Sequence, residues 1–300
     1  MKRISSIAAS ISVAIACSLS PLAWSACAPT GVQLQILGSG GPGPAGGRAS
    51  AGYLLWINGQ SRIMVDAGSG TKDQFHQAGA NLAELSLIAL SHLHPDHAAE
   101  LPAILWPAGA NLAVSGPGAA GVFPAVDDFL DSLFGAGGAF AILGDRVQLT
   151  PVTLDTGSPA AQNVWSDAGI VVRARAVPHG DVPTLAYRFD FGDTSIAFTS
   201  DQTGSDASFP DFIRDVDFLV IHMAVAENVA GVGAQLHAKP SVWGQMATAA
   251  QAGHVVVSHI SSVTAAALEA DLAILRANYT GTVTVAEDLL CVGLDRAAIR

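Results

Sequence analysis

The chain has 300 residues, half of them hydrophobic, and its formal net charge is −11 at pH 7. Only 13% of the residues are charged, which argues against a broad nucleic-acid-binding surface, since such a surface needs clustered Lys and Arg. A chain of 300 residues can form one large domain or two small ones.

The first 25 residues have the pattern of a cleaved secretory signal peptide. Lys2 and Arg3 give a positive start, residues 7–19 form an apolar core, and residues 23–25 offer small side chains at the cleavage position. The apolar core is shorter than the roughly 20 residues of a membrane span. We therefore expect a periplasmic or secreted protein without a membrane anchor, in which residues 26–300 form a single domain.

Signal cleavage would leave two of the three cysteines, Cys27 and Cys291. In an oxidising compartment such a pair predicts a disulfide that ties the chain ends together, and two free buried thiols are the alternative. On the chain-entropy model, closing so long a loop disfavours the unfolded chain by about 4 to 5 kcal/mol. Cys17 is a poor match to a lipoprotein processing site, which is the weaker interpretation of the leader.

The mature chain begins with short strands and tight turns. Alternating apolar and polar residues predict a strand at residues 32–37, and a glycine-rich loop follows at 38–50. This loop lacks the Gly-Lys-Ser/Thr of a phosphate-binding loop, so we interpret it as a flexible segment at the rim of a site. Asn58-Gly59 is a strong hairpin signal that joins predicted strands at residues 51–57 and 62–66.

Further along the chain, strands alternate with helices. Helices are predicted at residues 72–79, 98–105, 125–133, 241–252 and 264–277, and strands at 85–90, 112–115, 147–154, 170–177, 185–191, 195–199, 218–221, 255–258 and 282–285. Hairpins followed by strands that alternate with helices, twice over, indicate a layered α/β domain with two sheets inside and helices outside.

Residues 91–97 read SHLHPDH and directly follow the predicted buried strand at 85–90. Neutral imidazole is the commonest protein ligand for zinc, and carboxylate oxygen also suits this ion. A tight turn after a strand could aim two of these ligands at one ion and two at a second. The alternative is a polar loop that is rich in histidine by chance, which fits poorly with so dense a set.

Three further polar residues, His179, Asp201 and His259, each directly follow a predicted strand. Residues at strand ends in a layered fold can converge on one edge even when they lie far apart in sequence. With the opening motif they make seven candidate ligands, five His and two Asp. Seven ligands suit two metal ions that share a bridging carboxylate.

The order of these motifs resembles the metallo-β-lactamase superfamily of hydrolases. The resemblance rests on SHLHPDH, His179, residues 199–201 (TSD) and residues 258–259 (SH), and Asp66-Ala67-Gly68 looks like the first motif of that superfamily. It covers about residues 32 to 290 and implies an α/β fold, a four-layer αββα sandwich. Residues 178–180 (PHG), residues 185–188 (LAYR) and His237 are most similar to the branch with ribonuclease Z, periplasmic arylsulfatases and cyclic-nucleotide phosphodiesterases.

The resemblance also implies a ligand set for two zinc ions, although manganese or iron could occupy such sites. A hydroxide between the ions would attack the substrate, and Asp66 would orient the His-rich turn. His237 is the candidate proton donor, with a helix cap or a surface histidine as the alternative. One zinc would be held by His92, His94 and His179, the other by Asp96, His97 and His259, with Asp201 as the bridge; Asp96, Asp201 and His237 are the candidate catalytic residues.

The expected substrate is a small anionic ester, either a phosphodiester or an aryl sulfate. Asp201 occupies a position where many zinc β-lactamases lack a carboxylate, and no basic RNA-gripping insertion is present, so we expect no nucleic-acid partner. Lactone or β-lactam hydrolysis and a noncatalytic metal-binding module remain alternatives, and a homodimer is open. Lys239 and Arg188 could steer an anionic substrate or be ordinary charges, and for His222 a supporting or packing role is favoured.

Overall fold

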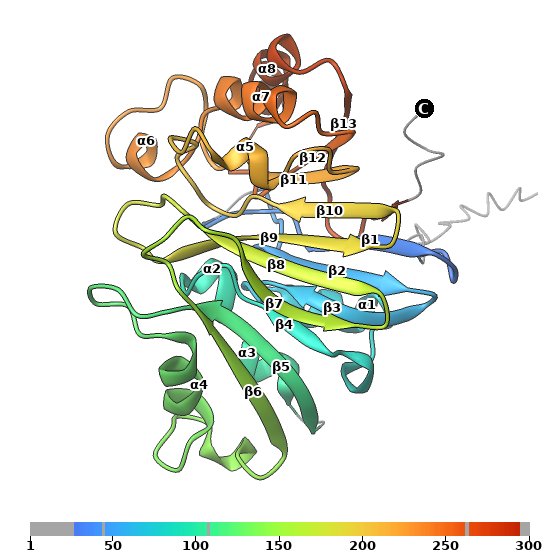
Figure 1. Cartoon of the computed structure of the whole chain (residues 1–300), viewed down its shortest axis with the longest axis vertical. Helices are drawn as coiled ribbons and strands as arrows, with labels where there is room; N and C mark the ends of the chain where they lie inside the picture. The colour runs from blue at the N-terminus through green and yellow to red at the C-terminus, as the bar shows by residue number, and fades with distance from the viewer. Residues whose placement is uncertain (1–26, 44–45, 107–108, 262–263, 295–300) are drawn as a thin grey trace, which may run out of the picture.

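The computed structural model describes residues 27–43, 46–106, 109–261 and 264–294. These residues form two seven-stranded sheets, packed together, with helices on their outer faces (Figure 1). This arrangement confirms the expected αββα sandwich. The expected signal peptide at residues 1–25 lies outside the described residues. Within the described part of the chain, no helix has the length and apolar character to cross a membrane.

The first sheet has the strand order β14-β1-β2-β3-β4-β5-β6. Strands β14, β1, β2 and β3 pair antiparallel, whereas β3 to β6 run parallel. Its strands are β1 (Val32–Gly38), β2 (Gly52–Ile57), β3 (Gln60–Val65), β4 (Leu87–Ala89), β5 (Ala110–Pro117), β6 (Val147–Leu154) and β14 (Cys291–Gly293).

The second sheet has the order β13-β12-β11-β10-β9-β8-β7. Strands β7 to β10 pair antiparallel, and β10 to β13 run parallel. Its strands are β7 (Gln162–Asp167), β8 (Ile170–Val177), β9 (Thr184–Phe191), β10 (Thr194–Phe198), β11 (Phe218–His222), β12 (His254–Ser258) and β13 (Thr282–Val285).

Three hydrophobic layers hold these sheets and helices together. The central layer lies between the sheets and includes Leu34, Tyr53 and Phe198, because alternate residues of each strand face inward. The helices that cover the outer face of the first sheet are α1 (Thr71–Gln77), α3 (Leu101–Leu105) and α4 (Val126–Phe134). Those on the second sheet are α5 (Phe209–Phe212), α7 (Pro240–Ala249) and α8 (Ala265–Asn278).

The structure differs from the predicted elements where the sequence signal is short or polar. The helix expected at residues 98–105 is two helices, and α2 (Pro95–Ala98) already begins inside the His-rich motif because Pro95 suits the first turn of a helix. Strand β7 has a mostly exposed, polar sequence, and β14 has only three residues, so neither was predicted. Helices α5 and α6 (Val232–Leu236) were also not predicted.

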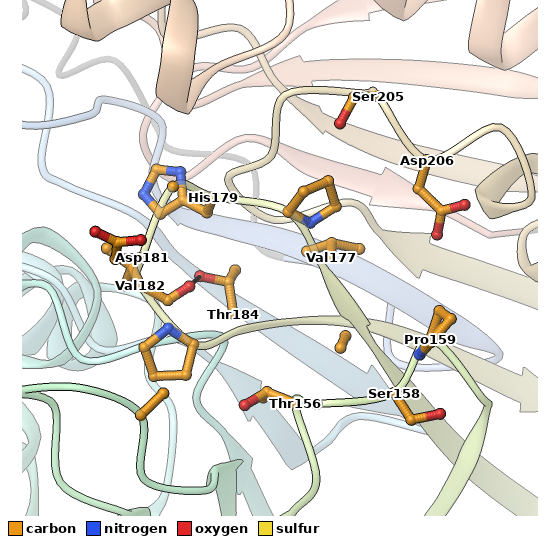
Figure 2. A pocket seen from close by; sticks show the side chains of 16 residues that line it. Thr156, Ser158, Pro159, Val177, His179, Asp181, Val182, Thr184, Ser205 and Asp206 are labelled. Carbon is orange, nitrogen blue, oxygen red and sulfur yellow. Dashed lines mark hydrogen bonds between the residues drawn. The ribbon is translucent and has the colours of Figure 1, made fainter.

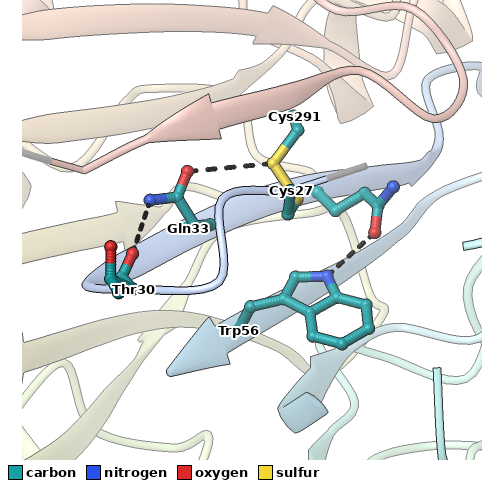
Figure 3. The surroundings of a disulfide bond; sticks show 6 residues. Cys27, Thr30, Gln33, Trp56 and Cys291 are labelled. Atoms are coloured by element: carbon teal, nitrogen blue, oxygen red, sulfur yellow. Dashed lines mark hydrogen bonds between the residues drawn. A yellow bond between two sulfur atoms is a disulfide. The ribbon is translucent and has the colours of Figure 1, made fainter. Parts of the chain in front are cut away.

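The predicted disulfide between Cys27 and Cys291 is present, with a Cα–Cα distance of 5.5 Å (Figure 3). Cys291 lies in β14, opposite Gln35 of β1, so the bond joins the first described residue to an edge strand of the first sheet. Nearby, Gln33 Nε2 donates to the Thr30 carbonyl at 3.2 Å (Figure 3). The disulfide therefore fixes both ends of the described chain at one sheet edge.

Candidate metal centre

The chemistry-bearing side chains gather where strands of both sheets end. In the first sheet, Asp66 follows β3 and the SHLHPDH motif follows β4. His179 follows β8 of the second sheet after one proline. In the second sheet, Asp201 lies three residues after β10, His222 ends β11 and His259 directly follows β12. The structure brings all seven predicted ligands together at this edge and adds His222 and His237 to them.

The local backbone explains how the His-rich motif turns. The amides of His97 and Ala98 both donate to the His94 carbonyl, at 2.9 and 3.0 Å, so α2 starts at once. The Ala67 amide donates to the His97 carbonyl at 2.6 Å. A Cβ on Gly68 would lie 2.0 Å from the Asp96 carbonyl oxygen, so only glycine permits this approach of the two loops.

Three residues of the site have a left-handed backbone although none is glycine. These are Asp66 (φ 56°), Ser200 (φ 55°) and His259 (φ 53°). Such conformations cost free energy and persist where the surrounding structure holds them. His259 is held on one side by Gly41 of the glycine-rich loop, because a Cβ there would lie 2.6 Å from the His259 ring. The loop thus lies at the site, as expected.

One group of ligand atoms is the three-histidine set, formed by His92, His94 and His179. His92 Nε2 lies 3.0 Å from His94 Nδ1. His179 Nδ1 lies 2.8 Å from the Leu236 carbonyl, which makes Nδ1 the donor and leaves Nε2 with its lone pair. This Nε2 is buried without a hydrogen-bond partner. Burial lowers the pKa of all three rings, which favours the neutral form that binds metal.

The second group is the mixed set, formed by Asp96, His97, Asp201 and His259. His97 Nε2 and His259 Nε2 lie 3.0 Å apart. Asp96 Oδ2 lies 3.3 Å from His259 Nε2 and 3.6 Å from His97 Nε2. Two imidazole nitrogens and a carboxylate oxygen that converge in this way match the donor set of a metal ion.

Asp201 is the member of the mixed set that also lies near the three-histidine set. Its Oδ2 is 3.6 Å from His97 Nε2 and 3.9 Å from His179 Nε2, and its Oδ1 is 3.5 Å from His259 Nε2. Burial raises the pKa of Asp201, but the nearby His259 and His97 outweigh it and hold the pKa well below its usual value. Asp201 is therefore a buried carboxylate at the point that a shared ligand would occupy.

Asp66 and His222 each contact a residue of the mixed set without being predicted ligands themselves. Asp66 Oδ1 accepts from the Ser91 amide at 2.7 Å, and its Oδ2 lies 2.8 Å from His97 Nδ1. A carboxylate at Nδ1 fixes the ring so that Nε2 presents its lone pair to the site. His222 Nδ1 lies 2.9 Å from Asp201 Oδ1, and its Nε2 lies 3.0 Å from the Tyr53 hydroxyl. Both nitrogens of His222 are thus occupied, in keeping with the supporting role expected for it.

The electrostatic field of the mixed set favours a cation. Burial lowers the pKa of His97, but the carboxylates of Asp66 and Asp201 outweigh it and raise the pKa well above its ordinary value. The same negative field that would hold a proton on His97 favours a metal cation at its Nε2. Together with the unpartnered Nε2 of His179, this shows that the residues present fit a metal ion.

His237 directly follows α6, and its side chain lies beside Asp201. Its Nδ1 lies 3.6 Å from Asp201 Oδ2 and is buried without a hydrogen-bond partner. Burial lowers the pKa of His237 to about 4, so the ring is neutral near pH 7. Lys239 lies two residues further on, whereas Arg188 donates to the Phe212 and Arg214 carbonyls and is a structural charge.

The fold and the His/Asp cluster define a metal-dependent hydrolase. Residues 61–260 match the family model described as a beta-lactamase superfamily domain. This match covers most of the chain, and the protein belongs to the beta-lactamase superfamily.

Two curated relatives are ribonucleases Z. The chain is 30% identical to the Mycobacterium marinum protein over 179 residues, which is 57% of this chain and 63% of that protein. It is 26% identical to the Mycobacterium bovis protein over 276 residues, 86% of this chain and 96% of that one. Because both relatives are named as ribonucleases, these comparisons do not support the expectation that the protein has no nucleic-acid partner.

Solved structures share the fold at lower identity. The metallo-beta-lactamase fold protein YhfI from Bacillus subtilis has a TM-score of 0.70 and 19% identity, with 87% of this chain and 98% of that chain covered. Zinc-bound PqqB from Methylobacterium extorquens has a TM-score of 0.65 and 14% identity, with 87% and 99% covered.

Proposed function

We propose that the protein is a secreted or periplasmic hydrolase that holds two zinc ions and cleaves small phosphodiesters or aryl sulfate esters. The observation that carries this proposal is the position of Asp201, whose Oδ2 is 3.9 Å from His179 Nε2 and 3.6 Å from His97 Nε2. A carboxylate within reach of both sets can serve two ions about 3.5–4 Å apart. The zinc-bound state of PqqB supports zinc, and manganese or iron would also suit the mixed set.

The ligands would divide between the two ions as the family resemblance implies. The three-histidine set would hold one ion, the side chains of Asp96, His97 and His259 would hold the other, and Asp201 would contact both. When bound, the ions would activate a water molecule and stabilise negative charge on the oxygens of the ester. Asp66 keeps His97 in the tautomer that binds metal, and His222 fixes Asp201 in place.

His237 is proposed to assist the leaving group. Its Nδ1 lies 3.6 Å from Asp201 Oδ2, so the ring stands beside the carboxylate that both ions would share. Because the pKa of His237 is lowered to about 4, the ring must first gain a proton before it can act as an acid. A bound anionic ester would favour that protonated form, since opposite charge raises the pKa of an imidazole.

Two independent features support an extracytoplasmic location. The leader at residues 1–25 has the pattern of a secretory signal, and the Cys27–Cys291 disulfide suits an oxidising compartment. A fusion of residues 1–30 to alkaline phosphatase, which is active only after export, tests the location. An inactive fusion would contradict it.

Other classes of substrate are alternatives, and each rests on a particular observation. The ribonuclease Z relatives favour RNA, and the superfamily membership favours lactones or β-lactams. A noncatalytic metal-binding module would keep the same ligands but no turnover.

The test is an activity panel with metal analysis on the same zinc-loaded sample. The panel contains bis-p-nitrophenyl phosphate, p-nitrophenyl sulfate, a lactone, a β-lactam and a short RNA. We expect about two zinc ions per chain and the highest kcat/KM on the phosphodiester or the sulfate. Metal-loaded protein that is inert towards every substrate would identify a metal-binding module instead.

A further inference from the structure

A pocket of about 470 Å³ adjoins the candidate metal centre at His179 (Figure 2). Figure 2 shows His179 and Asp181 at one end of the pocket, Asp206 at the other, and Thr156 and Ser158 along one side. A volume of this size suits a small molecule, since ligand pockets commonly measure about 300–1,000 Å³. The pocket is thus a candidate binding place for a part of the substrate that does not react.

His179 connects this pocket with the reacting centre. The residue is 1% exposed, and its Nε2 has no hydrogen-bond partner and belongs to the three-histidine set. The same residue lines the pocket. Among the described residues, His179 is the one that the pocket shares with the three-histidine set, so the pocket borders the candidate centre at this residue.

A tight turn fixes the rim of the pocket. The Val182 amide donates to the His179 carbonyl at 3.1 Å, which places Asp181 at the tip of the turn. Gly180 has a left-handed backbone (φ 59°), and a Cβ there would lie 2.7 Å from Leu236 Cδ2. Both conditions favour glycine at position 180, and the turn holds the Asp181 side chain at the rim of the pocket.

The charge of the pocket lining is negative. Asp181 and Asp206 line the pocket, and no Lys or Arg is among the described residues of its lining. Asp206 forms an ion pair with the buried Arg175 and accepts a hydrogen bond from the Ser208 amide, so its charge is balanced. Asp181 is exposed and makes no ion pair within the described part of the chain, which leaves one uncompensated carboxylate at the rim.

We propose that this pocket binds the second alcohol group of a phosphodiester and selects a small, positively charged amino alcohol over an anionic group. This inference rests on the proposed function and names its substrate class. In a nucleic-acid strand, the phosphate next to the reacting one would lie near the Asp181 carboxylate with no cation beside them, and the two negative charges would repel each other. An ammonium group would instead be attracted by Asp181, with an effect of about 2- to 5-fold for an exposed carboxylate.

The test compares three p-nitrophenyl phosphodiesters that share one leaving group. Their second alcohols are choline, its neutral isostere 3,3-dimethylbutanol, and 3-hydroxypropanoate. We expect kcat/KM to be about 2- to 5-fold higher for choline than for the isostere, and lowest for the carboxylate. Equal values, or faster cleavage of a short RNA than of the choline ester, would overturn the pocket proposal and leave the hydrolase proposal standing.

Asp181→Asn is the matching variant, with Asp193→Asn as the control. Asp193 is an exposed carboxylate in the turn between β9 and β10, at the far end of these strands from His179. The choline-to-isostere ratio should fall close to one in the Asp181 variant and stay at the wild-type value in the control. A ratio that is unchanged in both variants would also contradict the role of Asp181.

A binding measurement separates this proposal from turnover. Calorimetry with phosphorylcholine and with 3,3-dimethylbutyl phosphate compares the same two groups on zinc-loaded protein. Tighter binding of phosphorylcholine, lost in Asp181→Asn, would support the pocket even if no phosphodiester is cleaved. Equal affinities would reject it, whereas inactivity on all three esters would reject only the phosphodiester function.

Discussion

The three-histidine set and the mixed set lie next to each other but are held in place differently. In the first, His92 Nδ1 lies 3.0 Å from the Ser91 hydroxyl, His179 is held by one backbone carbonyl, and His94 is half-buried. In the second, His97 is held by the Asp66 carboxylate.

Support for the mixed set comes from both sheets. His222 of β11 holds Asp201, and Tyr53 of β2, in the opposite sheet, contacts His222. Residues that orient a ligand commonly change metal affinity by about 10- to 100-fold. We therefore expect the mixed set to bind its ion more tightly, and the three-histidine set to lose its ion first when metal is removed.

The largest effect is expected from Asp201→Ala, which removes a carboxylate that lies within 4 Å of ring nitrogens of both sets. Both ions should be lost or strongly weakened, and kcat/KM should fall by at least about 10²–10³-fold. Metal analysis after gel filtration and steady-state kinetics measure these changes, and Asp193→Ala is the control carboxylate. Full retention of both ions would contradict the shared position of Asp201.

A smaller loss of bound metal is expected from His94→Ala, because this substitution affects the three-histidine set alone. The metal content should fall to about one ion per chain, because the mixed set keeps all of its donors. The control is His76→Ala, since His76 is exposed on α1 and should have no effect on metal content. Loss of both ions from His94→Ala would show that the two sets are not independent.

Asp66→Asn should weaken the mixed set without removing a ligand. An amide cannot stabilise the His97 ring as a carboxylate does, so zinc affinity there should fall by about 10- to 100-fold. Competition with a chromogenic chelator measures the two affinities separately. If the three-histidine set were weakened more than the mixed set, the division between them would be wrong.

Most of the site could be predicted because its residues stand where apolar runs stop. His259 follows β12, in which all five residues are buried, and His179 follows β8, in which the last four residues are buried. Because β8 is antiparallel to β9 and β9 is antiparallel to β10, β8 runs in the same direction as the parallel strands β10 to β12, and these strands end at one edge. The pairing of Tyr53 with His222 could not be predicted in the same way. These residues lie on different sheets, 169 positions apart, and they meet only because the two inner faces pack together.

The two strands that were not predicted, β14 and β7, have a common physical cause. Strand β14 has three residues and is defined by its pairing with β1, so no periodic pattern marks it in the sequence. Strand β7 is an edge strand with a largely exposed, polar sequence, and its pairing with β8 compensates for weak strand propensity. In both cases the partner strand, rather than the local sequence, decides the conformation.

The histidines with lowered pKa and His97, whose pKa is raised, predict opposite pH effects on the stability of metal-free protein. Burial lowers the pKa of the three rings of the first set, and it lowers the pKa of His222 to about 4. Groups with lowered pKa stabilise the fold above the unfolded value of about 6.5, and this stabilisation is lost as the pH falls towards 4. His97 has a raised pKa, so its contribution is complete below about pH 6.5 and is lost as the pH rises.

The free energy of unfolding of metal-free protein should therefore be highest near pH 6.5 and decrease on either side. Urea denaturation of chelator-treated protein between pH 4 and 9 measures this profile. His97→Gln should remove the decrease on the alkaline side only. If His97→Gln instead removed the decrease on the acid side, the assignment of the two pH effects would have to be reversed.

The smallest effect on metal binding is expected from Tyr53→Phe, which tests how far the support of the mixed set extends. The Tyr53 hydroxyl lies 3.0 Å from His222 Nε2 and 2.9 Å from Ser258 Oγ. Its loss leaves buried polar atoms with one partner fewer, which should lower the free energy of unfolding by about 1–3 kcal/mol. Zinc affinity of the mixed set should fall less than tenfold, below the effect of Asp66→Asn, because Tyr53 acts on Asp201 only through His222.

Tyr187→Phe is the matched control for Tyr53→Phe. The Tyr187 hydroxyl is also buried between the sheets, and it donates to the Leu90 carbonyl at 2.9 Å rather than to a residue that supports a ligand. Both variants should lose comparable stability, and only Tyr53→Phe should change zinc affinity. Because the two substitutions remove the same group from the same layer, an equal fall in zinc affinity would mean that packing of the sheets, and not the chain from Tyr53 to Asp201, positions the mixed set.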